Sequence, residues 1–185
     1  WDGSGVLVAP RWVLTAAHCV LKKKRAPRFA KNLKVRFGSS TADQSREYRV
    51  VEIRITLPLD AKVLKPLLSD KVFKNGASNH ADRNDIALLK LDRDVEGIPV
   101  APLFEGRATA GVRICLAGFG CFATGRQKRE RQWKDDGLKR AAENILDRDG
   151  DGLVAFDFDN GQSERNTLKS NRLLDRSLSR MLGPG

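Results

Sequence analysis

The sequence predicts an all-β protein, and two patterns support this class. Apolar and polar residues alternate in short segments such as 33–37, 51–55 and 89–91, as is typical of strands with one face in water. Polar loops containing glycine and asparagine, such as residues 74–79, separate such segments. Many short strands joined by turns favour a sandwich or barrel.

The expected strands follow one another along the chain. Residues 5–9 and 12–14 are two apolar runs joined at Pro10-Arg11, and we expect a short strand in each. Further strands are expected at 33–37, 51–55, 86–91 and 112–117. Near the end, leucines recur every four residues at 174, 178 and 182. That spacing is typical of a helix face, so we expect this stretch to be helical or irregular.

The chain is strongly basic, with a net charge of +11 over 185 residues. Residues 21–36 contain eight basic side chains and no acidic one, and residues 126–140 are also rich in Lys and Arg. Such runs could follow a phosphate backbone, but solvated loops are the more common explanation. No aromatic platform is interleaved with them, so nucleic acid is not an expected partner. No apolar run approaches the ~18 residues that a membrane span needs, so no membrane partner is expected.

Three cysteines, at positions 19, 115 and 121, are too few for a dense disulfide framework. They also form no C-x-x-C pair of the zinc-binding kind, so no metal site is expected from them. Cys115 and Cys121 could bridge a tight turn or could equally be buried free thiols.

A candidate acid–base pair combines His18 with Asp85. Histidine suits general-base chemistry near neutral pH because its ordinary pKa is about 6.5. A carboxylate can hold such a ring in one tautomer by accepting its Nδ1 proton. Asp85 stands at the head of the apolar strand expected at 86–91, where an unpaired charge is costly. We therefore expect Asp85 to have a partner, although each residue alone has an ordinary structural explanation.

The residues around His18 and Asp85 favour a functional explanation over an ordinary structural one. Residues 12–19, W-V-L-T-A-A-H-C, resemble the histidine motif of the trypsin/chymotrypsin family of serine proteases. Residues 84–89, N-D-I-A-L-L, resemble the aspartate motif of that family, in the expected order. Residues 5–8 are similar to the strand before the histidine motif, and residues 117–120 to a Gly-aromatic-Gly turn.

The resemblance implies an all-β fold of two antiparallel Greek-key barrels, with the second barrel incomplete. Residues 1–105 would form the first barrel, carrying His18 and Asp85, and residues 106–185 the second. It implies a serine endopeptidase in which His18 is the general base and Asp85 orients it. Protein or peptide substrates, no cofactor and a secreted or periplasmic location follow from the same resemblance, while the oligomeric state stays open.

The nucleophile is the missing part of the pattern. The Gly-Asp-Ser-Gly-Gly-Pro motif of the family does not occur in the 185 residues. Gly185 is similar to its first glycine, and residues 156–161, F-D-F-D-N-G, resemble some bacterial-type members. We therefore expect an inactive fragment ending just before the serine, with Gly185 as an oxyanion-hole donor. By the same alignment Met181 would lie at the base of the primary specificity pocket.

One departure from the family concerns a disulfide. In the family, the cysteine of the histidine motif pairs with a cysteine sixteen positions earlier. That earlier position is Gly3 here, so the resemblance implies that Cys19 lacks this partner.

Two alternative functions remain open. The first is a catalytically dead, protease-like binding module that uses its basic surface. The second is calcium binding, because residues 147–152, D-R-D-G-D-G, resemble the front half of a calcium loop. The expected acidic ligand at the twelfth position is replaced by Phe158, so an acidic surface loop is the favoured interpretation.

Overall fold

The computed structural model describes residues 3–22, 28–56, 85–122, 134–150, 153–156 and 180–182. The chain divides into two compact units, Trp1–Phe37 with Gln44–Leu103, and Gly38–Asp43 with Phe104–Gly185. Within the described ranges the regular structure is β-strand apart from one 3-10 turn, which confirms the all-β class. No helix in these ranges has the length and apolar character needed to cross a membrane.

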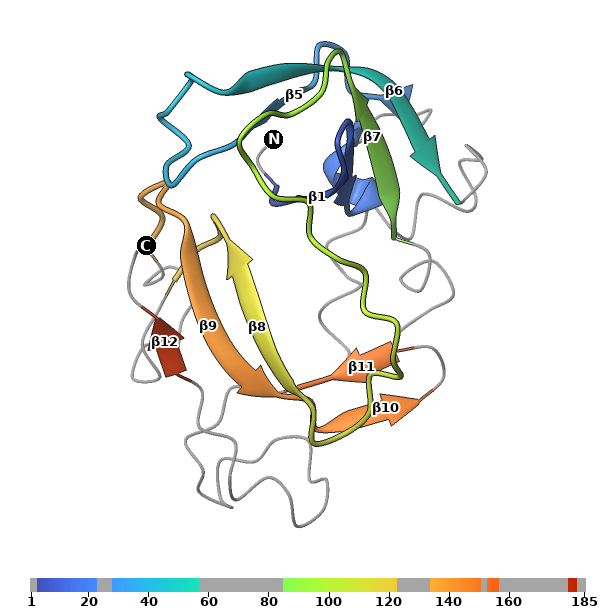
Figure 1. Cartoon of the computed structure of the whole chain (residues 1–185), viewed down its shortest axis with the longest axis vertical. Coiled ribbons are helices and arrows are strands. Elements are labelled where there is room, and N and C mark those ends of the chain that lie inside the picture. Colours follow the sequence, from blue (N-terminus) through green and yellow to red (C-terminus); the bar gives the residue numbers. More distant parts are fainter. Residues whose placement is uncertain are drawn as a thin grey trace. The chain divides into compact units, whose positions relative to one another are not determined.

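The first unit contains a five-stranded antiparallel sheet in the order β1-β2-β7-β6-β5 (Figure 1). Its strands are β1 (Val6–Ala9), β2 (Trp12–Thr15), β5 (Lys34–Arg36), β6 (Glu47–Ile55) and β7 (Ala87–Leu91). A 3-10 turn, η1 (Ala17–Cys19), leads to the short pair β3 (Leu21–Lys22) and β4 (Arg28–Phe29). The strands expected near 5–9, 12–14, 33–37, 51–55 and 86–91 are thereby confirmed.

Strand β7 shows why the alternating pattern produces this sheet. Ala87, Leu89 and Leu91 are buried, whereas Leu88 and Lys90 between them are partly exposed. Successive side chains of a strand point to opposite faces, so the apolar set lines one side. Together with residues of β1, β2 and η1, this set forms the hydrophobic core of the first unit. Burial of each large aliphatic side chain there stabilises the fold by about 1.5–3 kcal/mol.

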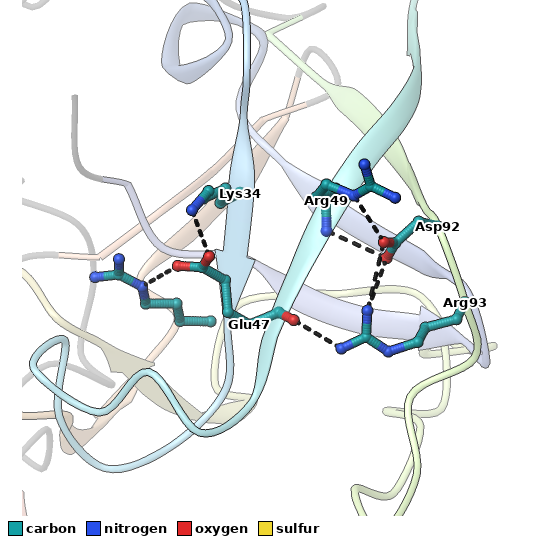
Figure 2. Close-up of polar contacts among 6 residues, drawn as sticks. Lys34, Glu47, Arg49, Asp92 and Arg93 are labelled. Atoms are coloured by element: carbon teal, nitrogen blue, oxygen red, sulfur yellow. Dashed lines mark hydrogen bonds and ion pairs between the residues drawn. The ribbon is translucent and has the colours of Figure 1, made fainter.

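Two acidic side chains form hydrogen bonds with basic residues of β5, of β6 and of the segment after β7 (Figure 2). The carboxylate of Glu47 accepts hydrogen bonds from Lys34 and from Arg36 Nε. These two bonds lower the pKa of Glu47 below its ordinary value. Asp92 accepts hydrogen bonds from Arg49 and Arg93 in the same way. Part of the basic charge noted in the sequence is therefore neutralised within the first unit.

The second unit contains a three-stranded antiparallel sheet in the order β12-β9-β8 and a separate hairpin (Figure 1). Its strands are β8 (Arg113–Gly118), β9 (Arg140–Ile145), β10 (Arg148–Gly150), β11 (Leu153–Ala155) and β12 (Arg180–Leu182). The strand expected at 112–117 corresponds to β8 and is confirmed. The second unit thus gathers its strands from the later part of the sequence.

Two details of the second unit differ from expectation. Leu182 lies in strand β12, opposite Ala141 of β9, so a helix is wrong for residues 180–182. Leu174 and Leu178 lie outside the described residues. Cys115 and Cys121 are free thiols, and both are exposed. They are therefore neither bridged nor buried.

An ion pair before β9 holds a carboxyl in its charged form. Both oxygens of Asp136 accept hydrogen bonds of 2.6 Å from the Arg140 guanidinium. The Leu138 N–H donates to the same carboxylate. These contacts, with the Arg140 bonds the largest cause, lower the pKa of Asp136 from 3.8 to about 2. Because the pKa of Asp136 is lower in the folded state, this carboxylate stabilises the fold at pH values above its ordinary pKa. That contribution is lost as the pH falls through about 2.

Replacement of this arginine should move the titration of Asp136. In Arg140→Gln we expect the pKa of Asp136 to rise toward its ordinary value, because the bidentate cationic donor is gone. Carboxyl carbon shifts followed by NMR between pH 2 and 6 measure this directly. The Arg140 guanidinium also lies over the Phe122 ring, 3.6 Å from its centroid. Phe122→Leu is therefore the control, and an equal rise in that variant would contradict the assignment to the ion pair.

Candidate active site

Strand pairing places the segment after β2 beside the segment before β7. These strands run antiparallel, with Trp12 opposite Lys90 and Thr15 opposite Ala87. The chain leaves β2 at Thr15 and reaches His18 in η1, while Asp85 lies two residues before the first residue of β7. Residues that are 67 positions apart in sequence therefore meet at one end of the sheet.

His18 and Asp85 are joined by two hydrogen bonds. The Nδ1 atom of His18 lies 2.6 Å from Oδ2 of Asp85. The backbone N–H of His18 donates to the other carboxylate oxygen, Oδ1, over 2.9 Å. The Asp85 side chain is 20% exposed and the His18 side chain 43% exposed. Asp85 is thus the more shielded partner, and both of its oxygens are directed at His18.

This geometry selects one form of the ring. An ionised carboxylate only accepts hydrogen bonds, so the short contact requires the proton on Nδ1. In the neutral ring the Nε2 atom then carries a lone pair. The backbone bond to Oδ1 fixes the carboxylate with respect to the peptide that carries the ring. The arrangement therefore supplies an oriented base with its accepting nitrogen on the side away from Asp85.

The 3-10 turn that carries His18 is tightly anchored. The Cys19 N–H donates to the carbonyl of Ala16, and the Val20 N–H to that of Ala17. Ala17 is fully buried, with 0% of its surface exposed, and Val20 is 2% exposed. Small and apolar neighbours thus hold the backbone of His18 against the core while its ring remains accessible.

The thiol of Cys19 lies beside Nε2, the second ring nitrogen of His18. Sγ of Cys19 lies 3.5 Å from Nε2 of His18, so the S–H can donate weakly to the lone pair. Burial raises the pKa of the Cys19 thiol, a hydrogen bond with Thr15 opposes this, and the charge of Asp85 adds to the rise. A raised pKa keeps the thiol protonated and poorly nucleophilic at neutral pH. Sequence reasoning missed this contact, although the glycine at position 3 was a signal that Cys19 is unpaired.

The structure gives a position to Met181 but not to Gly185, the other two residues of the expected site. Met181 lies in β12, where its backbone is opposite Ala142 of β9. Gly185 lies outside the described residues, so the structure gives it no position. His18 and Asp85 are the two members of the expected site that the structure brings together.

The described part of the acidic segment 147–152 includes a strand, and residues 151 and 152 lie outside the described residues. Residues 148–150 form β10, which pairs with β11 as an antiparallel hairpin. Asp149 forms an ion pair with Arg107 and accepts a hydrogen bond from the Ala110 N–H. Among the residues with described positions, no cluster of three or more His, Cys, Asp or Glu could hold a metal ion. Asp151, Asp157 and Asp159 lie outside the described residues, so calcium binding at this segment stays an untested alternative.

Comparison with known proteins provides independent information. The family model described as Trypsin matches residues 2–150. Kallikrein-4 of Homo sapiens is 31% identical over 128 residues, which are 66% of this chain and 41% of that protein. The CLIP domain-containing serine protease B4 of Anopheles gambiae is 29% identical over 128 residues, 63% of this chain and 32% of that protein. The matched regions thus span less than half the length of either curated relative.

Among solved structures, the human heparin binding protein is 18% identical, with a TM-score of 0.47. That similarity covers 77% of this chain and 53% of the other. It is too distant to bear on what this chain binds. The family match, in contrast, extends over both of the motifs that carry His18 and Asp85. The chain belongs to the trypsin family of serine proteases.

Proposed function

We propose that this chain carries the histidine and aspartate of a serine endopeptidase whose full protein cleaves peptide bonds. The observation that supports this most strongly is the 2.6 Å contact between Nδ1 of His18 and Oδ2 of Asp85. In a Ser-His-Asp triad the carboxylate fixes the tautomer and stabilises the imidazolium that forms. The geometry at His18 suits both tasks, because each oxygen of Asp85 already accepts a bond from that residue.

In the proposed reaction His18 carries one proton during acylation, and during deacylation it carries a proton from the attacking water back to the serine. Nε2 takes the proton of a serine hydroxyl as its oxygen attacks the substrate carbonyl, and gives that proton to the leaving amine. Gly185 is proposed as one backbone donor to the oxyanion, a role worth about 3 kcal/mol. Met181 is proposed for the primary pocket, where its apolar side chain would favour apolar or mixed substrates over basic ones.

The 185 residues alone are proposed to be inactive. No Gly-Asp-Ser-Gly-Gly-Pro sequence occurs in them, and loss of the nucleophile costs a triad enzyme of order 10⁶-fold in kcat. Secretion or a periplasmic location remains a prediction from the sequence.

Active-site labelling of the full-length protein tests this function. A fluorophosphonate reacts only with a serine that an adjacent base activates, so we expect stoichiometric labelling and hydrolysis of casein. His18→Ala should abolish both, and His80→Ala, which changes the other histidine of the chain, should change neither. Folded full-length protein that fails to react would contradict the proposal. Salt-sensitive retention on heparin by such unreactive protein would instead favour the binding-module alternative.

A further inference from the structure

Three carboxylates on and beside strand β6 each lie between two cationic side chains. The three groups are Glu47 with Lys34 and Arg36, Asp92 with Arg49 and Arg93, and Glu52 with Arg54 and Lys90. Figure 2 shows the groups around Glu47 and Asp92. Six cations and three carboxylates leave a net charge of +3, so pairing within the chain neutralises this set only in part. We call the set the β6 cationic surface.

Two of these cations are directly opposite each other on neighbouring strands. Lys34 of β5 is the register partner of Arg49 of β6, and such partners have Cβ atoms about 4.5–5.5 Å apart on the same face. Like charges in this position destabilise the pairing. Lysine on an edge strand such as β5 discourages association with other sheets, but this does not explain Arg49, because β6 lies between β5 and β7. An anion bound between the two side chains would remove their repulsion.

The carboxylate that holds Arg49 lies deeper than the cations around it. The Asp92 side chain is 13% exposed, whereas those of Arg49 and Arg93 are 77% and 59% exposed. Asp92 accepts its side-chain hydrogen bond from Nε of Arg49, and no described residue accepts one from the two terminal nitrogens. Those nitrogens form a planar fork that suits bidentate binding of a carboxylate. An anion arriving from solvent therefore meets an oriented cation with available donors.

The dimensions and the apolar content of the surface favour an extended peptide as the partner. Side chains on one face of a strand are about 6.6–6.8 Å apart, and alternate side chains of an extended peptide have the same spacing. Val51 of β6, two residues from Arg49, is 60% exposed and adds a large apolar side chain. A nucleic acid or sulfated sugar chain carries denser charge, and tight binding to such a backbone uses about 6–10 phosphate contacts. The three carboxylates of this surface disfavour a partner of that kind.

We propose that the β6 cationic surface binds an extended segment of a partner protein in which acidic and apolar residues alternate. The carboxylates of the segment bind at Lys34 and Arg49, and its apolar side chains pack on Val51. The interaction is noncovalent and uses none of the residues proposed for catalysis. It therefore does not depend on the proposed peptidase function.

Fluorescence anisotropy with a labelled peptide of ten alternating Glu and Val residues tests this surface in the 185-residue chain. We expect saturable binding of one peptide per chain at low salt, with weaker binding as the salt concentration rises. Arg49→Glu should lower the affinity about tenfold, because an exposed attraction is replaced by a repulsion. The matched control is Arg113→Glu in β8, since the Arg113 side chain is 75% exposed and also pairs with one carboxylate, that of Glu143. It makes the same change in net charge and should leave the affinity within about twofold.

Two further variants test the remaining parts of the surface. Lys34→Gln should weaken binding about threefold at low salt, because one exposed attraction is lost. Val51→Ser should weaken it at low and high salt alike, because salt does not screen the loss of an apolar contact. Exposed ion pairs contribute little to stability, so these variants should fold. If Arg49→Glu does not fold, Arg49→Gln provides the same test with a smaller expected loss.

Three results would overturn the proposal. The first is a lack of binding of the peptide to the parent chain, or equal binding of a peptide with Gln in place of Glu. The second is an equal loss of affinity in Arg49→Glu and Arg113→Glu, which would show a general attraction to positive charge. The third is an Arg49-dependent affinity for heparin or a DNA oligonucleotide that exceeds the affinity for the peptide, because the partner would then be a polyanion.

Discussion

Asp85→Asn should lower the kcat of the full-length protein by roughly 10⁴-fold, the loss that this change causes in a Ser-His-Asp triad. The amide has nearly the same shape as the carboxylate, so the fold should be kept. Its charge is lost, however, and its NH₂ group can face Nδ1 of His18. The neutral ring then carries its proton on Nε2, so this nitrogen cannot accept the proton of the nucleophile. Steady-state kinetics on a peptide substrate measure the loss.

The matched control for this variant is Asp94→Asn. Asp94 also forms an ion pair, with Arg11 at 2.8 Å, but its side chain is 62% exposed. Exposed pairs of this kind contribute about 0–1 kcal/mol, so stability and kcat should hardly change. Circular dichroism should show that both variants fold. A kcat for Asp85→Asn within tenfold of the parent value would contradict the role assigned to Asp85.

Gly3→Cys should form a disulfide with Cys19 and stabilise the first unit by about 3 kcal/mol under oxidising conditions, the value for closing a loop of this length. The added Cβ would lie 3.1 Å from the Cβ of Cys19, slightly closer than the ~3.5–4.5 Å of ordinary disulfides. A backbone shift of a few tenths of an ångström at residue 3 would relieve this crowding. Thiol titration should find two free thiols in the oxidised variant, since one cysteine is added to the three present and two pair.

Gly3→Ala tests the effect of the added Cβ atom without the disulfide bond. The alanine brings the same Cβ to 2.6 Å from Sγ of Cys19 without a compensating bond. We expect it to destabilise the chain by about 1–3 kcal/mol, as overpacking does elsewhere. Urea unfolding with and without reductant measures both variants. Equal stability of oxidised Gly3→Cys and Gly3→Ala would show that no stabilising disulfide forms.

The sequence predicted the first unit better than the second for a physical reason. In β7 the buried residues alternate with partly exposed ones, so the period of the strand is visible in the sequence. Strand β9 has the sequence R-A-A-E-N-I, and all of its residues except Asn144 are partly exposed. Its pairing with β8 on one side and β12 on the other makes it a strand, and such tertiary pairing has no local sequence signal.

The candidate site was also predicted only in part from the sequence. The two motifs predicted that an imidazole and a carboxylate belong together, and the β2–β7 register explains physically how they meet. No sequence pattern indicated that the backbone N–H of His18 also donates to Asp85. The contact of Cys19 with Nε2 depends on the side-chain direction within the 3-10 turn. In the acidic segment, residues 148–150 pair with residues 153–155, and the calcium-loop resemblance did not indicate this pairing.

Asp85 holds the His18 ring with its proton on Nδ1 and its lone pair on Nε2. The chain has two histidines, so His80→Gln leaves one imidazole to observe. Nitrogen-15 NMR of that variant, at a pH where the ring is neutral, separates protonated from unprotonated ring nitrogens. We expect Nδ1 to carry the proton, and Asp85→Asn to move it to Nε2, which is the tautomer that free histidine prefers. A proton on Nε2 in the parent chain, or no change on replacing Asp85, would contradict the claim.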